Sequence, residues 1–273
     1  MDRQAESGSL INFSLKECVI VCVITGFVAA MLFPVFVRAR ETSSQVTCAS
    51  NLAQLGRAFS QYAQDNDQKY PVGPLGAFGS RWGNGWAGAI SPDVKNVAAF
   101  KCPDDATVPA ANENDVSFVL NARITSDSPV EGAVAGSLAK VTMPARTICL
   151  LEAQGQSAVL TNAGETGSKW LSSTFDQSNM LWKTGSGNEV NASGDDQLTA
   201  GHAPVVLASG EPAYWKTLPS ACQSWWGSPS GRHDEAANYL MCDGHVQCVL
   251  PKAVTTMSAA DTNGPYVVTF SVQ

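Results

Sequence analysis

Carboxylates, histidines and cysteines are the side chains through which this 273-residue chain could do chemistry, and their spacing limits that chemistry. His233 lies ten residues before Asp243, and these two could share a metal ion or a proton with Glu152. Asp195 and Asp196 lie in a stretch rich in glycine and asparagine and could offer oxygen ligands to calcium, although their spacing matches no EF-hand loop. None of the eight cysteines has the Cys-x-x-Cys spacing of a zinc or redox site. We expect no cofactor, with calcium as the alternative.

The patterns of a catalytic or nucleic-acid-binding protein are missing from the sequence. It has three histidines, no G-x-S-x-G nucleophile elbow and no H-E-x-x-H zinc motif. Residues 83–88 match G-x-G-x-x-G, but they lie in a glycine-rich stretch rather than between a strand and a helix, so no dinucleotide site is expected. The net charge of −7 has the wrong sign for attraction to phosphates. We therefore expect neither an enzyme nor a nucleic-acid partner.

The most apolar segment runs from Cys18 to Val37 and contains no charged residue. Its length suits a helix that crosses about 30 Å of hydrocarbon. Twelve of its residues are Val, Ile, Leu or Phe, which favour insertion by about 4–7 kcal/mol. The residues before it include Asp2, Arg3 and Glu6, unlike the basic start of a cleaved signal peptide. The segment is therefore predicted to be a retained transmembrane helix.

An amphipathic helix is predicted to continue this segment. Apolar residues recur at spacings of four, three, four and three, at Cys48, Leu52, Leu55, Phe59 and Tyr62. This stripe indicates a helix that reaches about Asp67 and buries one face against a globular head. Pro34 removes one backbone hydrogen bond and should loosen the rod.

The rest of the chain is predicted to be a β-rich head with long loops. Candidate strands cover residues 116–124, 147–151, 204–208, 238–242, 245–250 and 266–272. Asp243-Gly244 lies between two apolar runs and predicts a hairpin with a two-residue type I′ turn. Residues 153–201 are polar and are expected to form a long loop. The predicted fold class is α+β, with the long N-terminal helix packed on an antiparallel sheet.

The N-terminal residues resemble the start of type IV pilins and type II secretion pseudopilins. In that family the mature chain begins with Phe, has Glu at its fifth position and commonly has Pro at its twenty-second. Counted from Phe13, Glu17 and Pro34 fall on these positions. The resemblance implies cleavage by a prepilin peptidase after Asn12 and methylation of Phe13. It divides the chain into a polar leader (1–12), a transmembrane and filament-core helix (13–37), an amphipathic stem (38–67) and the head (68–273).

The head resembles a bacterial prepilin-type family with a His-(nine residues)-Asp-Gly motif, here His233, Asp243 and Gly244. Other family landmarks occur in order at residues 48–52, 70–71, 101–103, 116–118 and 121. The family does not supply the chemical role of the motif. We expect His233 to hydrogen-bond into the hairpin, while the metal or proton-transfer role named above stays the alternative.

Disulfide bonds are expected, because eight cysteines suit an oxidising exterior. Six cysteines lie outside the membrane segment and allow fifteen pairings. The resemblance favours Cys48 with Cys102, since both lie on family landmarks and the bond would join the stem to the head. The second pairing that we propose is Cys222 with Cys248.

The resemblance implies a structural subunit of a type IV pilus or a type II secretion pseudopilus. Its partners would be identical or related subunits, the prepilin peptidase, the inner-membrane assembly platform and the lipid bilayer. The carboxylate of Glu17 would pair with the free amine of Phe13 in a neighbouring subunit. The expected location is the bacterial inner membrane with a periplasmic head, or an extracellular filament after assembly.

Two departures from the family pattern favour an alternative. Asn12 stands where the family usually has glycine, and Lys16 stands where it has an apolar residue. In this alternative the protein is exported and keeps its signal as an anchor, and its tryptophan-rich head binds polysaccharide or another surface ligand. Tryptophan side chains that are exposed on loops can stack on sugars, and the chain has seven tryptophans.

Overall fold

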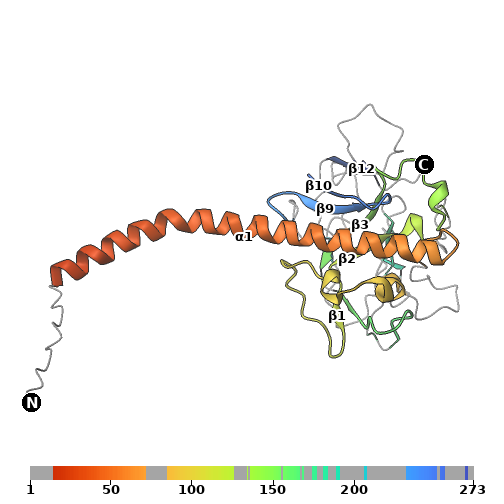
Figure 1. Cartoon of the computed structure of the whole chain (residues 1–273), viewed down its shortest axis with the longest axis horizontal. Coiled ribbons are helices and arrows are strands. Elements are labelled where there is room, and N and C mark those ends of the chain that lie inside the picture. The colour runs from red at the N-terminus through yellow and green to blue at the C-terminus, as the bar shows by residue number, and fades with distance from the viewer. Residues whose placement is uncertain are drawn as a thin grey trace, which may run out of the picture. The chain divides into compact units, whose positions relative to one another are not determined.

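The computed structural model (Figure 1) describes residues 15–71, 85–125, 134, 136–154, 156–166, 168, 174–176, 181–183, 189–190, 206–207, 232–250, 253–255 and 268–269. The chain forms two compact units, Met1–Ser43 and Ser44–Gln273. The polar leader, with Asn12 and Phe13, lies outside the described residues.

A single helix, α1 (Leu15–Asp65), covers most of both predicted helical segments and continues through Pro34. In the first unit its large apolar side chains between Leu15 and Val37 are 48% to 82% exposed. By length and composition, α1 is the described helix that could cross a membrane, and none of its most apolar part is buried. The predicted long helix is therefore confirmed, and its apolar part suits a transmembrane segment.

In the second unit, the predicted stripe faces the core. Cys48, Leu52, Leu55 and Phe59 are buried, and Tyr62 packs beside them partly buried. These side chains share one apolar core with residues of the sheet, because a stripe at helical spacing presents a single face.

The centre of this core contains aromatic rings. Phe59 stacks on Trp86 with 5.7 Å between ring centroids and meets Tyr70 edge to face at 5.6 Å. Trp86 and Phe100 lie 6.1 Å apart by the same measure. Large buried rings of this kind dominate the energy of a core.

The main sheet has the order β10-β9-β3-β2-β5-β6-β7, and β8 also pairs with β3. All of its described pairs are antiparallel except β2–β5, which is parallel. The described fold is therefore of the α+β class, as predicted, with a sheet that is antiparallel but for one pair. Two smaller pairs, β1–β4 and β11–β12, lie outside this sheet.

The strands are β1 (Asn114–Asp115), β2 (Phe118–Asn121), β3 (Ile148–Gln154), β4 (Ser157–Ala158), β5 (Thr174–Asp176), β6 (Leu181–Lys183), β7 (Glu189–Val190), β8 (Val206–Leu207), β9 (Ala237–Met241), β10 (Val246–Val249), β11 (Val254–Thr255) and β12 (Val268–Thr269). The short helices are α2 (Trp86–Ile90), η1 (Ser91–Asp93), η2 (Val97–Phe100), η3 (Ala122–Ile124) and η4 (Leu138–Lys140).

The six predicted strands each overlap an observed one: β2, β3, β8, β9, β10 and β12. The predicted long loop at 153–201 is wrong in part, because β4 to β7 lie within it and the end of β3 reaches into it. These four strands have two or three residues each, too few to display an alternation of apolar and polar side chains.

The β9–β10 hairpin (blue in Figure 1) is confirmed, but its turn differs from the prediction. The N–H of Met241 donates to the carbonyl of His245 at 2.8 Å, and the N–H of Gly244 donates to the carbonyl of Met241 at 2.9 Å. Gly244 has a φ of 91°, whereas Asp243 keeps a negative φ. This is a three-residue loop with glycine in the left-handed position, not a type I′ turn.

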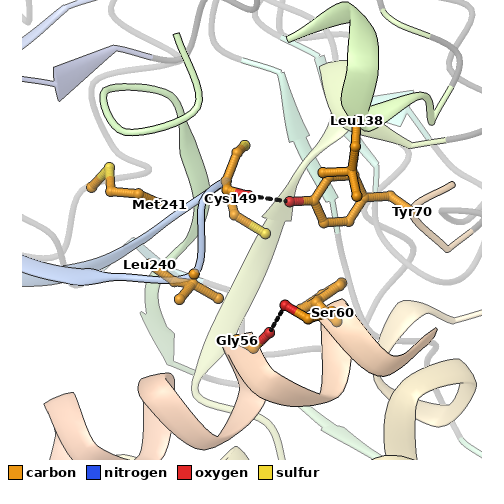
Figure 2. A pocket seen from close by; sticks show the side chains of 10 residues that line it. Gly56, Ser60, Tyr70, Leu138, Cys149, Leu240 and Met241 are labelled. Atoms are coloured by element: carbon orange, nitrogen blue, oxygen red, sulfur yellow. Dashed lines mark hydrogen bonds between the residues drawn. The ribbon is translucent and has the colours of Figure 1, made fainter. Parts of the chain in front are cut away.

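This turn lies directly against α1. A Cβ atom on Gly56 would come within 2.8 Å of Leu240 Cδ1 and 3.1 Å of the Gly244 carbonyl oxygen. Figure 2 shows Gly56 on the helix and Leu240 across from it. The helix approaches the hairpin this closely because residue 56 has no side chain.

We expect Gly56→Ala to lower the free energy of unfolding of the head by about 1–2 kcal/mol, because the added methyl group overpacks the contact with Leu240 and Gly244. Without the overpacking, replacing glycine by alanine in a helix interior would raise the free energy of unfolding by about 1 kcal/mol, so the expected change has the opposite sign. Denaturant unfolding of the full-length protein in detergent micelles, followed by tryptophan fluorescence, measures it.

The matched control is Gly26→Ala in the same helix, where no atom lies within 4 Å of the added Cβ. It should leave the unfolding of the head unchanged. A Gly56→Ala protein as stable as the unmodified chain would show that the contact between α1 and the hairpin is looser than described.

Candidate functional site

Four buried polar side chains meet where α1 packs on the sheet. They are Cys48 from α1, Cys102 from the segment after η2, Glu152 from β3 and His233 from the turn before β9. Each residue is 0% exposed, and one thiol, carboxylate or imidazole atom from each lies within 4.8 Å of the others. We call these four residues the buried thiol–imidazole–carboxylate cluster.

The carboxylate of Glu152 lies at the centre of the cluster. Its Oε1 accepts a hydrogen bond from the Cys48 thiol at 3.1 Å and lies 3.1 Å from His233 Nε2. The backbone N–H and the side-chain amide of Asn238 donate to the same oxygen at 3.3 and 3.2 Å. Cys102 Sγ lies 3.5 Å from His233 Nε2. Glu152 Oε2 is buried and has no hydrogen-bond partner.

These contacts change the protonation of the thiol and the imidazole. A hydrogen bond from Cys48, together with one from His233, outweighs burial and lowers the pKa of Cys102 to about 6. Burial alone would lower the pKa of His233, but its hydrogen bonds with Cys102 and Glu152 raise that pKa to about 11. The hydrogen bond with Cys102, burial and the charge of Glu152 raise the pKa of Cys48. At neutral pH these shifts favour a Cys102 thiolate beside a protonated His233.

A thiolate beside an imidazole can act as a nucleophile or as a metal ligand. A nucleophile must reach its substrate, and all four side chains of the cluster are fully buried. A metal ion needs no such access once it is bound. The arrangement therefore suits metal binding, or a closed network of hydrogen bonds, better than catalysis.

Two hydrogen bonds position Cys102. The side-chain amide of Asn51 in α1 donates to the carbonyl of Lys101 at 2.8 Å. The backbone N–H of Cys102 donates to Ser117 Oγ at 2.9 Å. The segment that carries Cys102 is thus held between the helix and the residue just before β2.

Other polar contacts between elements lie at landmark positions that the sequence analysis named. The side-chain amide of Asn121 donates to the carbonyl of Ile148 at 2.8 Å and joins the end of β2 to the start of β3. The hydroxyl of Tyr70 donates to the carbonyl of Cys242 at 3.0 Å and holds the chain after α1 against the hairpin. These buried bonds explain why such residue types stand at these positions.

The structure gives the His-(nine residues)-Asp-Gly motif two different surroundings. His233 lies in the cluster with Glu152, one of the two partners that the metal or proton-transfer alternative named for it. Asp243 lies apart from it, 37% exposed, with its Oδ1 2.6 Å from His245 Nδ1. Asp195 and Asp196 lie outside the described residues.

The position of Cys48 and Cys102 beside His233 was not predicted from the sequence. Cys48 occupies a position of the apolar stripe and resembles an ordinary core residue, while Cys102 lies in a different landmark. The structure brings Cys48 and Cys102 together as free thiols, and their disulfide stays a prediction. Cys248 is an exposed free thiol in β10, and its proposed partner Cys222 lies outside the described residues.

A small cavity lies between α1 and the hairpin (Figure 2), and no residue of the cluster lines it. Its volume of about 30 Å³ has room for one or two water molecules and excludes an organic ligand. Cys149 and Tyr70 face it, and burial raises the pKa of both groups. The described cavity is therefore no substrate site.

The side chain of Glu165 fills the space beside the glycine-rich segment at α2. The N–H of Gly88 donates to Glu165 Oε1 at 2.7 Å, and a Cβ atom on Gly85 or Gly88 would collide with that carboxylate or its stem. Glu165 is 0% exposed. The described glycines of this segment thus make room for a buried carboxylate.

The residues expected to act in assembly or in sugar binding are only partly described. Glu17 lies in the first turn of α1, and Pro34 lies within it. Trp86 is fully buried in the aromatic core and therefore has no face for a sugar. The side chains of the other six tryptophans lie outside the described part of the structure.

Comparison of the chain with protein-family models, with curated proteins and with solved structures finds no match.

Proposed function

We propose that this protein is a pilin-like structural subunit that assembles through the first half of α1, in a type IV pilus or a type II secretion pseudopilus. The single observation that carries the proposal is the division of α1. From Leu15 to Val37 it exposes fourteen large apolar side chains, and from Cys48 onward it buries one apolar stripe in the head.

The exposed apolar surface requires a partner. Soluble monomers rarely expose contiguous apolar patches larger than a few hundred Å². Lipid can cover such a helix in the membrane, and helices of like subunits can cover it in a filament. A helix that is apolar all round, rather than along one stripe, can be covered first by lipid in the membrane and then by other helices in a filament.

Glu17 supplies a reason for ordered assembly. A carboxylate at the edge of a hydrocarbon layer is costly unless it is paired. Lys16 is adjacent to Glu17 in the helix and therefore points in a different direction. The free amine of Phe13 in a neighbouring subunit would pair with Glu17 and set the register between helices.

One prediction of this proposal concerns processing of the leader. Intact mass spectrometry of the protein extracted from bacterial membranes should show a chain that begins at methylated Phe13, because assembly requires its free amine. A chain that still begins at Met1 would contradict assembly and support the alternative, a permanently anchored exported protein whose head binds a surface ligand.

Another prediction of this proposal concerns Glu17. Glu17→Gln keeps the shape of the side chain and removes its charge, so it should reduce the yield of subunits that co-purify with a tagged second copy by about tenfold, the effect of losing one charge-assisted hydrogen bond. Affinity capture from detergent-solubilised membranes measures it.

The matched control for this experiment is Lys16→Gln, which removes a charge from the neighbouring position of the same turn. It should leave the yield of co-purified subunits within about twofold. Equal yields from the Glu17→Gln and unmodified proteins would contradict the pairing with Phe13.

A further inference from the structure

The buried thiol–imidazole–carboxylate cluster has the donor set of a structural metal site. Zinc binds thiolate, imidazole and carboxylate groups, and its structural sites have four protein ligands in a tetrahedron. Cys48, Cys102, Glu152 and His233 supply two sulfurs, one oxygen and one nitrogen. From these residues we propose that the head binds one zinc ion between α1 and the sheet.

The distances within the cluster suit this geometry. With zinc bonds of ordinary length, the ligand atoms of a tetrahedral site lie about 3.4–3.8 Å apart. Cys102 Sγ and His233 Nε2 lie 3.5 Å apart, and Glu152 Oε1 lies 3.1 Å from both Cys48 Sγ and His233 Nε2. The other three pairs of ligand atoms lie within 4.8 Å of one another, so shifts of about 1 Å or less would complete the tetrahedron.

Glu152 supplies a second and independent observation. It is 0% exposed, yet its Oε2 has no hydrogen-bond partner. A buried carboxylate oxygen without a partner is costly and calls for an explanation, such as an ion. Asn238 donates to Oε1, the proposed ligand atom, with its backbone N–H and its side-chain amide, and thereby fixes the orientation of the carboxylate. Oε2 belongs to the same carboxylate, whose charge a bound ion would compensate.

The surroundings of His233 fit the same role. Its Nε2 points into the cluster, while Nδ1 lies 3.5 Å from Asp104 Oδ2, within ion-pair range but without the geometry of a hydrogen bond. A metal-bound histidine commonly offers its second nitrogen to a carboxylate, which fixes the orientation of the ring. Arg232 interacts with Cys102 and Glu152, and its positive charge offsets the excess of negative ligands around the metal.

The site would be structural rather than catalytic. Four protein ligands leave no open position for water or substrate. The ligands come from α1, the segment after η2, β3 and the turn before β9, so one ion would join four parts of the head that are far apart in sequence. Its binding energy would add directly to the stability of that fold.

The test is metal analysis of the full-length protein in detergent micelles, purified under reducing conditions and loaded with zinc. We expect about one zinc per chain after gel filtration, and a loss of most of it in Cys48→Ser, Cys102→Ser and His233→Gln. Cobalt in place of zinc should give the visible spectrum of a tetrahedral site with thiolate ligands.

Two further variants separate metal binding from misfolding. Asp104→Asn keeps all four ligands and should weaken zinc binding by about tenfold to a hundredfold, as changes at the outer partner of a metal-bound histidine do. Cys248→Ser removes the exposed thiol of β10 and should keep a full complement of zinc. Circular dichroism should show the same secondary structure in both variants.

Three results would overturn the proposal. The folded, reduced protein could bind no zinc or cobalt. The Cys48→Ser and Cys102→Ser proteins could retain full metal content. Peptide mass spectrometry of protein taken from cells under thiol-blocking conditions could find Cys48 bonded to Cys102, a disulfide that leaves no thiolate for the metal.

Discussion

Packing of the second half of α1 on the sheet is the interaction on which the rest of the described head depends. The apolar stripe from Cys48 to Phe59 lies in the same core as the central strands, and the aromatic rings of Trp86 and Phe100 extend that core. The first half of the helix has the opposite character, with its large apolar side chains exposed. One continuous helix therefore has to satisfy two different environments.

Polar and steric contacts at two points give this packing its specificity. One is the buried thiol–imidazole–carboxylate cluster at Cys48, and the other is the close approach of Gly56 to the hairpin turn. They lie eight residues apart, about 12 Å along the helix axis. Strand β9 contributes to both, because Asn238 bonds to the cluster and Leu240 lies against Gly56. Apolar burial alone would allow the helix to slide, whereas these two contacts define its register on the sheet.

Residues with periodic or local patterns were predictable from sequence. Helix α1 and its buried stripe follow from a spacing near 3.6, and the hairpin follows from Asp243-Gly244. The turn type was not predictable from that dipeptide, because Asp243 accepts a hydrogen bond from the N–H of His245 and stays at negative φ. The cluster was hidden for a different reason: its four members come from four separate segments, so no local spacing relates them. The link between Glu152 and His233 was foreseen only as an alternative.

The charges of the cluster distinguish the two states open to its cysteines. A disulfide between Cys48 and Cys102 would join two segments and leave Glu152 and His233 as a buried ion pair, with Glu152 Oε2 still unpartnered. Buried ion pairs are stable only when their remaining polar atoms are satisfied. A metal ion would use both sulfurs, the imidazole and the carboxylate together, and its positive charge would add to that of Arg232 in compensating the carboxylate. A metal would therefore use the carboxylate as a ligand, whereas a disulfide would leave His233 and Arg232 to compensate its charge.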